Sequence, residues 1–288
     1  MNHISDITNK IFTGDCRNVL PEFPSESIDM VLTSPPYWKL RDYHHENQIG
    51  WEKNADEYIE NLSKVFQQIH RILKPTGSLW INMSDQYENK SLLCLPWRLM
   101  LNLKSKGWIL RNTCIWHKPN AMPASVKDRL NQNYEFLFHL VKSRKYYYNL
   151  NEVRTPHLTR KRFMDNAKIT KRNLEIKNVS RETFHQNPKR QPGHPDSHAF
   201  HPNGKNPGAI ISIPTNHTAG IHPATYPEEL CRIPILASSP PGGIVLDPFS
   251  GIGTTLFTAK KLGRRYVGIE KNAQYVQNSI CKLYGLSA

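Results

Sequence analysis

Residues 243–255 read G-I-V-L-D-P-F-S-G-I-G-T-T. Its apolar beginning is typical of a short buried strand, and the pattern of residues 254–262 indicates a helix. Gly251 and Gly253 permit a sharp turn between them and a close approach of the backbone to a ligand. Glu270 ends the next apolar run, 23 residues after Asp247, about the spacing of a ribose-binding acid. The stretch therefore predicts a strand, a turn and a helix that hold a nucleoside.

Three classes of ligand compete for this turn. A Walker A loop requires Gly-Lys-Ser/Thr after the glycines, and Thr254-Thr255 lacks the lysine. A nicotinamide or flavin fingerprint requires a third glycine, where this chain has Leu256. Acids at the ends of two strands, Asp247 and Glu270, suit a cationic nucleoside without phosphate. S-adenosylmethionine fits best, with ribose hydroxyls for Glu270 and an ammonium for the Asp247 side.

A second unusual stretch, T-S-P-P-Y-W at residues 33–38, ends the apolar run 28–32. Its two consecutive prolines fix φ and remove two backbone donors, so the turn can only accept hydrogen bonds. The Ser34 hydroxyl, the Pro35 carbonyl and the flat face of Tyr37 suit a planar group with an N–H donor. The alternative is a prolyl turn that only ends a strand and caps the core with aromatic side chains.

Most of the chain alternates strand-like and helical segments, as a parallel sheet with covering helices requires. The pattern predicts strands over 10–13, 28–32, 77–83, 109–116, 134–141, 243–246 and 265–269. It predicts helices over 58–73, 96–105, 254–262 and 272–284, the first stopped by Pro75 and Gly77. The fold class is therefore α/β and doubly wound, with ligands beyond the carboxyl ends of the strands.

This alternation fails between residues 151 and 214. The segment holds 12 Lys or Arg against five Asp or Glu, so it carries half of the chain's net charge of +14. We expect one catalytic and cofactor-binding domain, formed by residues 1–150 and 215–288, and a basic lobe at 151–214 inserted into it. Such a charge favours a polyanionic partner.

Other features of the sequence narrow the class of protein. The five cysteines include no C-x-x-C pair, which argues against both a zinc site and a disulfide framework. His194, His198 and His201 lack a completing cysteine or acid, so no metal is expected. No apolar run approaches the length of a membrane span, and the N-terminus shows no signal pattern. A soluble, cytoplasmic protein with no membrane partner is expected.

The two motifs, T-S-P-P-Y at 33–37 and D-P-F-S-G-I-G-T-T at 247–255, closely resemble those of amino-methylating DNA methyltransferases of restriction–modification systems. Their order, with the catalytic motif first and a basic insertion before the cofactor motif, is similar to the β arrangement of that family. H-P-A-T-Y-P at 222–227 and Gly14-Asp15 match further family segments. The resemblance spans nearly the whole chain. It implies a Rossmann-like, mostly parallel seven-stranded S-adenosylmethionine-dependent sheet with an inserted target-recognition lobe.

The resemblance also implies the roles of individual residues. Those of the catalytic turn are Ser34, Pro35, Pro36 and Tyr37. Those that bind the cofactor are Asp15, Cys16, Thr225, Asp247, Pro248, Phe249, Gly251, Gly253, Thr254 and Glu270. Those that bind DNA are Arg160, Lys161, Arg162, Lys171 and Arg172. The segments W-H-K-P-N at 116–120 and N-Y-E at 133–135 resemble a part of the family that lines the base pocket, although ordinary strand ends would look the same.

The family's fold places the strand ending at Leu246 beside the strand ending at Leu32, so the methyl donor and the S-P-P-Y turn would share one cleft. A base flipped out of double-stranded DNA would stack on Tyr37. Its amine would donate to Ser34 Oγ and the Pro35 carbonyl, which makes the nitrogen more nucleophilic. Catalysis would then rest on positioning and on preorganised electrostatics, because the motif contains no strong general base.

A serine at position 34 is typical of relatives that methylate cytosine at N4, whereas Asp or Asn is typical of the adenine enzymes. We therefore expect a site-specific cytosine-N4 methyltransferase that protects host DNA in a prokaryotic cytoplasm, paired functionally with a restriction endonuclease without a stable complex. Adenine-N6 methylation on the same fold stays open. So does a basic nucleic-acid-binding protein with a vestigial pocket, although the intact Asp247, Gly251, Gly253 and Glu270 weigh against it.

Overall fold

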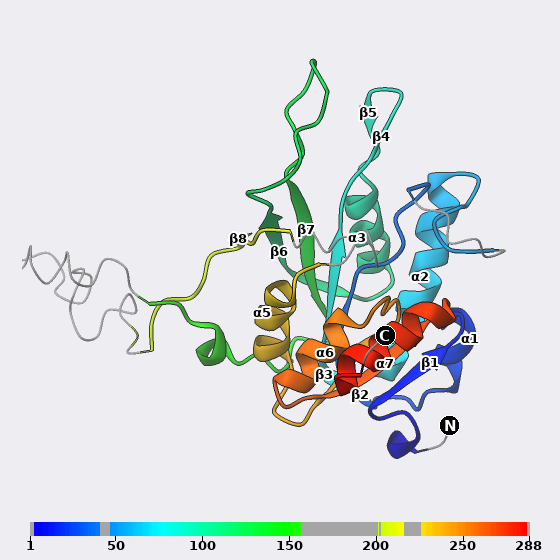
Figure 1. Cartoon of the computed structure of the whole chain (residues 1–288), viewed down its shortest axis with the longest axis vertical. Coiled ribbons are helices and arrows are strands. Elements are labelled where there is room, and N and C mark those ends of the chain that lie inside the picture. The colour runs from blue at the N-terminus through cyan, green and yellow to red at the C-terminus, as the bar shows by residue number, and fades with distance from the viewer. Residues whose placement is uncertain (1–2, 41–46, 157–200, 202, 216–225, 287–288) are drawn as a thin grey trace, which may run out of the picture. The chain divides into compact units, whose positions relative to one another are not determined.

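A computed structural model describes residues 3–40, 47–156, 201, 203–215 and 226–286. The chain divides into two compact units, one formed by Met1–Asn149 with Ala209–Ala288 and the other by Leu150–Gly208. The larger unit contains the sheet and its helices (Figure 1). In the smaller unit, the described residues form the short helix η3 (Leu150–Val153) and a bridge between Thr155 and Lys205.

The central sheet has eight strands in the order β1-β10-β9-β2-β3-β7-β6-β8. Within the described part of this sheet, β7 alone runs against the others, which confirms the mostly parallel doubly wound fold. In this order, the strands span Lys10–Thr13, Arg265–Glu270, Ile244–Asp247, Ile28–Thr33, Leu73–Met83, Tyr134–Val141, Ile109–His117 and Ile210–Ser212.

The eighth strand was not expected from the sequence, which predicts seven. β8 pairs in parallel with β6, through Ile115 with Ile210 and His117 with Ser212. Its three residues lie in the stretch assigned to the basic lobe, and the polar composition around them hides so short a strand. Residues 209–214 therefore belong with the sheet.

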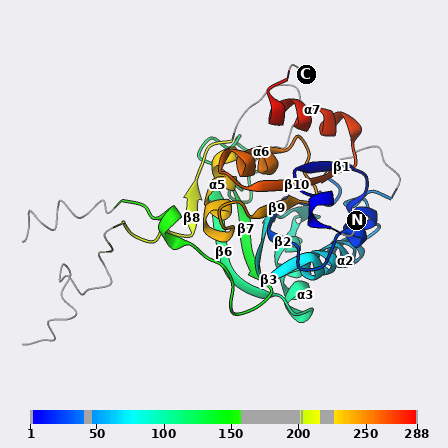
Figure 2. The ribbon, with the colours of Figure 1, turned by 90° about the horizontal axis from the view of Figure 1, so that it is seen from below.

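Helices cover both faces of the sheet (Figure 2). Strand β2 shows why, because its side chains alternate between the two faces. Val31 packs in the core beneath α2 and α3, whereas Met30 and Leu32 pack in the core beneath α5 and α6. The helices are α1 (Cys16–Val19), α2 (Ala55–Ile72), α3 (Leu95–Ser105), α5 (Glu228–Ser238), α6 (Thr254–Lys261) and α7 (Ala273–Tyr284).

The junction of α2 and β3 differs from the expected helix stop. The helix ends at Ile72 and the strand begins at Leu73, so Pro75 and Gly77 lie inside β3. The pairing with β2 shifts between residues 28 and 30, and such a bulge tolerates a proline. A Cβ on Gly77 would lie 2.6 Å from Leu73 Cγ and 2.9 Å from the Asp29 carbonyl oxygen. The close approach of β2 and β3 therefore requires this glycine.

The short helix α1, helix α5 and a hairpin were also missed in the sequence. Helix α5 contains Pro234 in its interior, which disguises its helical pattern. A small hairpin, β4 (Tyr87–Glu88) and β5 (Ser91–Leu92), follows β3. Among the helices of the described residues, none is both long and apolar enough to cross a membrane.

Candidate active site

The two motifs meet at the centre of the sheet. Strands β2 and β9 are direct neighbours, with Met30 opposite Val245 and Val31 opposite Leu246, as expected. From this pair the chain continues outward in both directions, to β3 on one side and to β10 on the other. The order of a doubly wound sheet reverses at such a point, and ligands bind there beyond the carboxyl ends of the strands.

Asp247 joins the two motifs. Its Oδ1 accepts hydrogen bonds from Thr33 Oγ1 at 2.7 Å and from Phe249 N at 3.1 Å. Its Oδ2 accepts from Thr255 Oγ1 at 2.7 Å and from the Tyr226 hydroxyl at 3.0 Å. Burial raises the pKa of this 1% exposed carboxyl, and the hydrogen bonds oppose that shift only in part. The sequence predicts an ammonium on the Asp247 side, and in the structure both oxygens of this carboxylate accept hydrogen bonds from the protein.

Glu270 faces the glycine turn. Its Oε2 accepts from Gly251 N and its Oε1 from Asn272 N, both at 2.8 Å. Burial raises the pKa of this carboxyl, and the backbone hydrogen bonds partly offset the shift. A carboxylate offers about four lone-pair positions, so these two bonds leave capacity for a diol. The side chain is therefore oriented by the backbone and is still able to accept hydrogen bonds from a ribose.

The turn itself has the geometry that its glycines allow. Gly253 has a φ of +78°, and a Cβ there would lie 2.8 Å from Ser279 Oγ. Helix α6 starts directly after it with Thr254, which is buried. Pro248 is buried and Phe249 half-buried. This close packing brings the backbone of the turn to the strand end where Glu270 lies.

The Gly14-Asp15 turn abuts the same strand end, because Gly14 N donates to the Glu270 carbonyl oxygen at 2.8 Å. Asp15 caps α1 and accepts from Arg17 N at 3.0 Å and from the Arg17 guanidinium. Burial opposes ionisation of Asp15, but the hydrogen bonds and charge of Arg17 outweigh it and lower the pKa. Cys16 is buried, which raises the pKa of its thiol and keeps it neutral. These two residues therefore border the cofactor turn from the far side of β10.

The hydroxyl groups of two tyrosines, Tyr58 and Tyr37 itself, hold the S-P-P-Y turn in place through hydrogen bonds. The Tyr58 hydroxyl of α2 donates to the Pro36 carbonyl oxygen at 2.8 Å. The Tyr37 hydroxyl donates to Glu135 Oε2 at 2.8 Å and lies 3.4 Å from Ser34 Oγ. Burial, followed by the charge of Glu135, raises the pKa of Tyr37 well above its usual value. Tyr37 is thus a neutral, fixed side chain, and the neighbouring Pro36 is anchored through its carbonyl oxygen.

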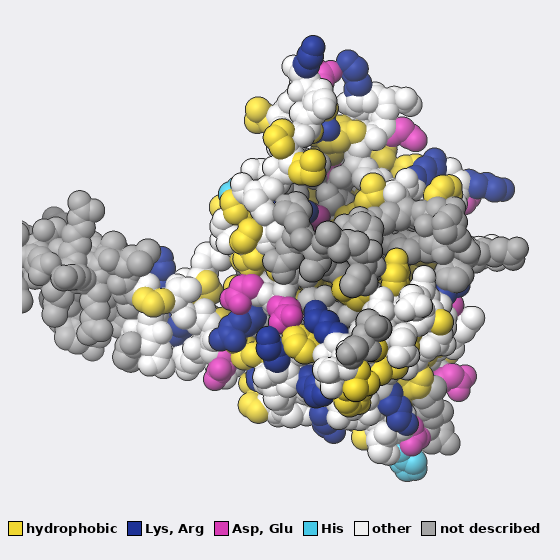
Figure 3. Space-filling view, in the orientation of Figure 1, with side chains coloured by type: hydrophobic (Ala, Val, Ile, Leu, Met, Phe, Trp, Pro, Cys, Tyr) yellow, Lys and Arg dark blue, Asp and Glu magenta, His cyan; other side chains and the backbone are white. Residues whose placement is uncertain are grey.

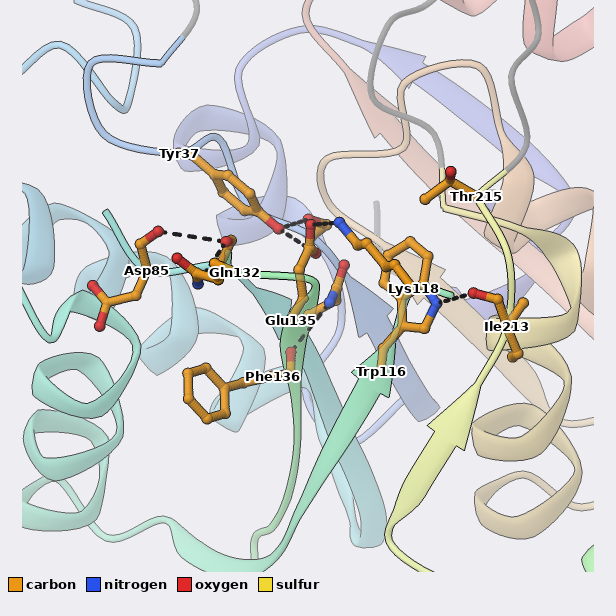
Figure 4. Close-up of polar contacts among 12 residues, drawn as sticks. Tyr37, Asp85, Trp116, Lys118, Gln132, Glu135, Phe136, Ile213 and Thr215 are labelled. Atoms are coloured by element: carbon orange, nitrogen blue, oxygen red, sulfur yellow. Dashed lines mark hydrogen bonds and ion pairs between the residues drawn. The ribbon is translucent and has the colours of Figure 1, made fainter. Parts of the chain in front are cut away.

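A buried ion pair supports Tyr37 (Figure 4). Glu135, only 8% exposed, pairs through Oε1 with the Lys118 ammonium. The ammonium also lies 4.5 Å from the centroid of the Trp116 ring, whose Nε1 donates to the Ile213 carbonyl oxygen at 2.9 Å. Lys118 follows the end of β6 and Glu135 lies near the start of β7, so antiparallel pairing brings them together. We call Tyr37, Glu135 and Lys118 the tyrosine cluster.

Several contributors to this site were missed in the sequence, although two lie in segments matched to the base pocket. No pattern in the sequence singles out Glu135 or Lys118. Three hydroxyl residues were also missed, because their shared partner, Asp247, is recognised only in the fold; they are Thr33, Tyr226 and Thr255. Some residues singled out in the sequence lie outside the described residues. They are the proposed cofactor residue Thr225, the histidines His194 and His198, and the five residues assigned to DNA binding, Arg160, Lys161, Arg162, Lys171 and Arg172. Within the described part of the chain, no group of acids, histidines and cysteines could hold a metal ion.

This geometry belongs to a known class of enzyme. The family model described as DNA methylase, N6_N4_Mtase, matches residues 28–281, and the chain belongs to this family. The resemblance seen in the two motifs is thereby confirmed, as are the DNA methyltransferase activity and S-adenosylmethionine as the cofactor.

Individual relatives span nearly all of the chain. The chain is 35% identical to the Type II methyltransferase M.Cfr9I from Citrobacter freundii, over 96% of this chain and 87% of that protein. It shares its fold with the cytosine-N4-specific PvuII DNA methyltransferase at a TM-score of 0.69, with 18% identity over 96% of this chain and 86% of that one. A putative DNA modification methylase from Thermus thermophilus, solved with S-adenosyl-L-methionine, matches at a TM-score of 0.58, with 24% identity over 94% of this chain and 91% of that one.

Proposed function

We propose that the chain is a site-specific methyltransferase that transfers the methyl group of S-adenosylmethionine to N4 of a cytosine flipped out of double-stranded DNA. One observation carries the proposal: the Ser34 turn ends β2 directly beside β9, whose own end leads into the glycine turn. Donor and acceptor would therefore meet in one cleft at the switch point of the sheet.

The cofactor would be held by the second motif. Glu270 would accept the ribose hydroxyls through its remaining lone pairs, since Gly251 and Asn272 already orient it. The Asp15-Cys16 turn would border the adenine, and the turn after β9 would approach the methionine end. Asp247 would contribute by holding this turn against Thr33. Thr225 and Pro248 keep their proposed places beside the cofactor.

The first motif would hold the base. The flipped ring would stack on Tyr37, and its amine would donate to Ser34 Oγ and the Pro35 carbonyl oxygen. These bonds draw the nitrogen lone pair out of the ring and aim it at the methyl group. The C–N bond forms as the sulfonium C–S bond breaks, which leaves a neutral thioether. The methylated nitrogen then loses one proton to solvent, so positioning rather than a strong base would supply the acceleration.

Cytosine is favoured over adenine by Ser34. A hydroxyl is shorter than the Asp or Asn typical of adenine-specific relatives, so the amine must sit nearer the turn, which suits a smaller ring. The structural likeness to the cytosine-N4-specific PvuII enzyme is in keeping with this choice. Adenine N6 is the second candidate, because some relatives with the same four residues methylate adenine.

The biological role follows from the class. The chain would protect host DNA in a prokaryotic cytoplasm against a restriction endonuclease that shares its site, without a stable complex between the two proteins. The basic segment 151–214 would read that site, and its residues proposed to contact DNA are Arg160, Lys161, Arg162, Lys171 and Arg172.

A product analysis tests the proposal. The purified protein is incubated with S-adenosylmethionine and DNA of mixed sequence, and the digested nucleosides are identified by mass spectrometry. We expect N4-methylcytosine, and a Ser34→Ala variant should form far less of it while still binding S-adenosylmethionine. N6-methyladenine as the sole product would overturn the assignment of the base. No product on any DNA would overturn the proposed activity.

A further inference from the structure

Residues 118–133 project from the larger unit as a loop between β6 and β7, which we call the arm. Lys118 N donates to the Asn133 carbonyl oxygen at 2.8 Å, and Asn131 Nδ2 donates to the Met122 carbonyl oxygen at 3.2 Å. The outgoing and returning segments of the arm therefore lie side by side. Its two ends adjoin the tyrosine cluster, because Lys118 and Glu135 both belong to that cluster.

The hairpin that follows β3 braces the arm. Lys90 of the hairpin forms an ion pair with Asp128 at 2.8 Å. The guanidinium carbon of Arg129 lies 4.0 Å from the centroid of the Tyr87 ring. The hairpin and the arm are far apart in the sequence, but they lie side by side beyond the same end of the sheet (Figure 1). A loop held in this way presents its outer side chains at defined positions.

Two large apolar side chains lie midway along the arm, and cations lie beyond them toward its tip. Leu130 is 91% exposed and Met122 is 79% exposed, and the bond from Asn131 to Met122 places them at neighbouring positions. Single exposed apolar residues are ordinary, but two large ones together on one projecting loop are not. Figure 3 shows hydrophobic side chains on the upper projection with Lys and Arg at its tip. Lys127 and Arg129 supply positive charge on the same segment as Leu130.

We propose that the arm is a DNA wedge, with Leu130 entering the base stack at the target site. This inference rests on the proposed function, because a base delivered to Tyr37 must come from a duplex that lies against the ends of the arm. Flipping one nucleotide leaves a gap in the stack. Apolar side chains such as leucine enter base stacks as wedges in DNA-bending proteins. Lys127 and Arg129 complement the phosphates on either side.

The reach of the arm fits this role. Leu130 is three residues from Asn133, which is hydrogen-bonded to Lys118, so an extended chain sets Leu130 at most about 11 Å from that end of the arm. The major groove of B-DNA is about 8.5 Å deep. A base held at Tyr37 and an apolar side chain in the stack that the base has left are therefore compatible with one bound duplex.

The test compares two substrates that carry the methylation site mapped for the wild-type protein. In one the duplex is intact, and in the other the target base lies opposite an abasic site, so it leaves the stack at little cost. Leu130→Ala should lower kcat/KM on the intact duplex about tenfold or more and stay within about twofold of wild type on the abasic substrate. Leu101→Ala, at a 64% exposed leucine of α3, is the matched control and should match wild type on both.

Three results would overturn the wedge. The first is an unchanged rate for Leu130→Ala on the intact duplex, and the second is an equal loss on both substrates. The third is a wild-type dimer that Leu130→Ala converts to a monomer in sedimentation, because the apolar patch would then cover a second copy of the chain. If the wild-type protein methylates neither substrate, the proposed function is wrong, and the wedge, which rests on it, is wrong as well.

Discussion

Neutralising Glu135 should slow methyl transfer without weakening cofactor binding. The Glu135 carboxylate accepts a hydrogen bond from the Tyr37 hydroxyl at 2.8 Å and pairs with Lys118. In Glu135→Gln the shape and one acceptor oxygen persist, while the charge is lost. The Tyr37 ring would then be held less firmly as the platform for the base.

The size of the effect follows from the kind of bond that is lost. A hydrogen bond to a charged, buried group contributes about 1.5–3 kcal/mol, of which the glutamine retains a part. A residual loss of about 1.4 kcal/mol corresponds to about a tenfold decrease in kcat/KM. Tyr37→Phe removes the same bond from the other side and keeps the stacking face, so it should cost about the same. Because both changes act on the Tyr37–Glu135 hydrogen bond, their effects should not add, and the double variant should be hardly slower than the slower single variant.

Steady-state methylation of duplex DNA by the four proteins measures this coupling. Calorimetric titration should show unchanged affinity for S-adenosylmethionine in all of them. Glu229→Gln, at an exposed glutamate on α5, controls for the loss of a negative charge. A double variant about 100-fold slower than wild type would mean that Tyr37 and Glu135 act independently, and Glu135 would then not act through Tyr37.

Three further predictions concern other parts of the chain. Glu270→Ala should abolish or greatly weaken S-adenosylmethionine binding in calorimetry, and wild-type affinity would refute the placement of the ribose. Burial lowers the pKa of His139 to about 3, so the unfolded state binds more protons between that value and about 6.5, and stability should fall with decreasing pH there by at most about 1.4 kcal/mol per unit. His139→Gln should flatten this dependence in thermal melts at pH 4–7. Neutralising basic residues of segment 151–214 should reduce the salt slope of DNA binding by roughly one unit per lost phosphate contact and leave cofactor affinity intact; the candidates are Arg160, Lys161, Arg162, Lys171 and Arg172.

Much of the fold could be predicted because its signals are local. The strand over residues 134–141 has the expected bounds, and α3 begins one residue earlier than expected. Periodicity fails where a residue contradicts its element, as Pro234 does inside α5. It fails also where an element is only three residues long, as in β8. In both places the tertiary packing overrides a weak local preference.

The site was less predictable because its contacts are distant in sequence. Tyr37 and Glu135 are 98 residues apart, and their hydrogen bond exists only because β7 returns antiparallel between β3 and β6. The register, with Trp116 opposite Glu135, then sets Lys118 beside the carboxylate. A change of register by one residue would turn Glu135 to the other face of the sheet.

Asp247 illustrates the same limit in a residue whose importance the motif did reveal. A carboxylate after a buried strand suggests a ligand contact, but this one accepts four hydrogen bonds from the protein, including one from Thr33 on the neighbouring strand. Thr33 immediately precedes Ser34, so the bond links the residue before the proposed catalytic turn to the residue that opens the proposed cofactor turn. With the two turns linked through one buried carboxylate, the distance between the proposed sites of methyl donor and acceptor would depend on Asp247 even though its side chain need touch neither. A substitution there would therefore disturb the alignment on which a reaction driven by positioning depends.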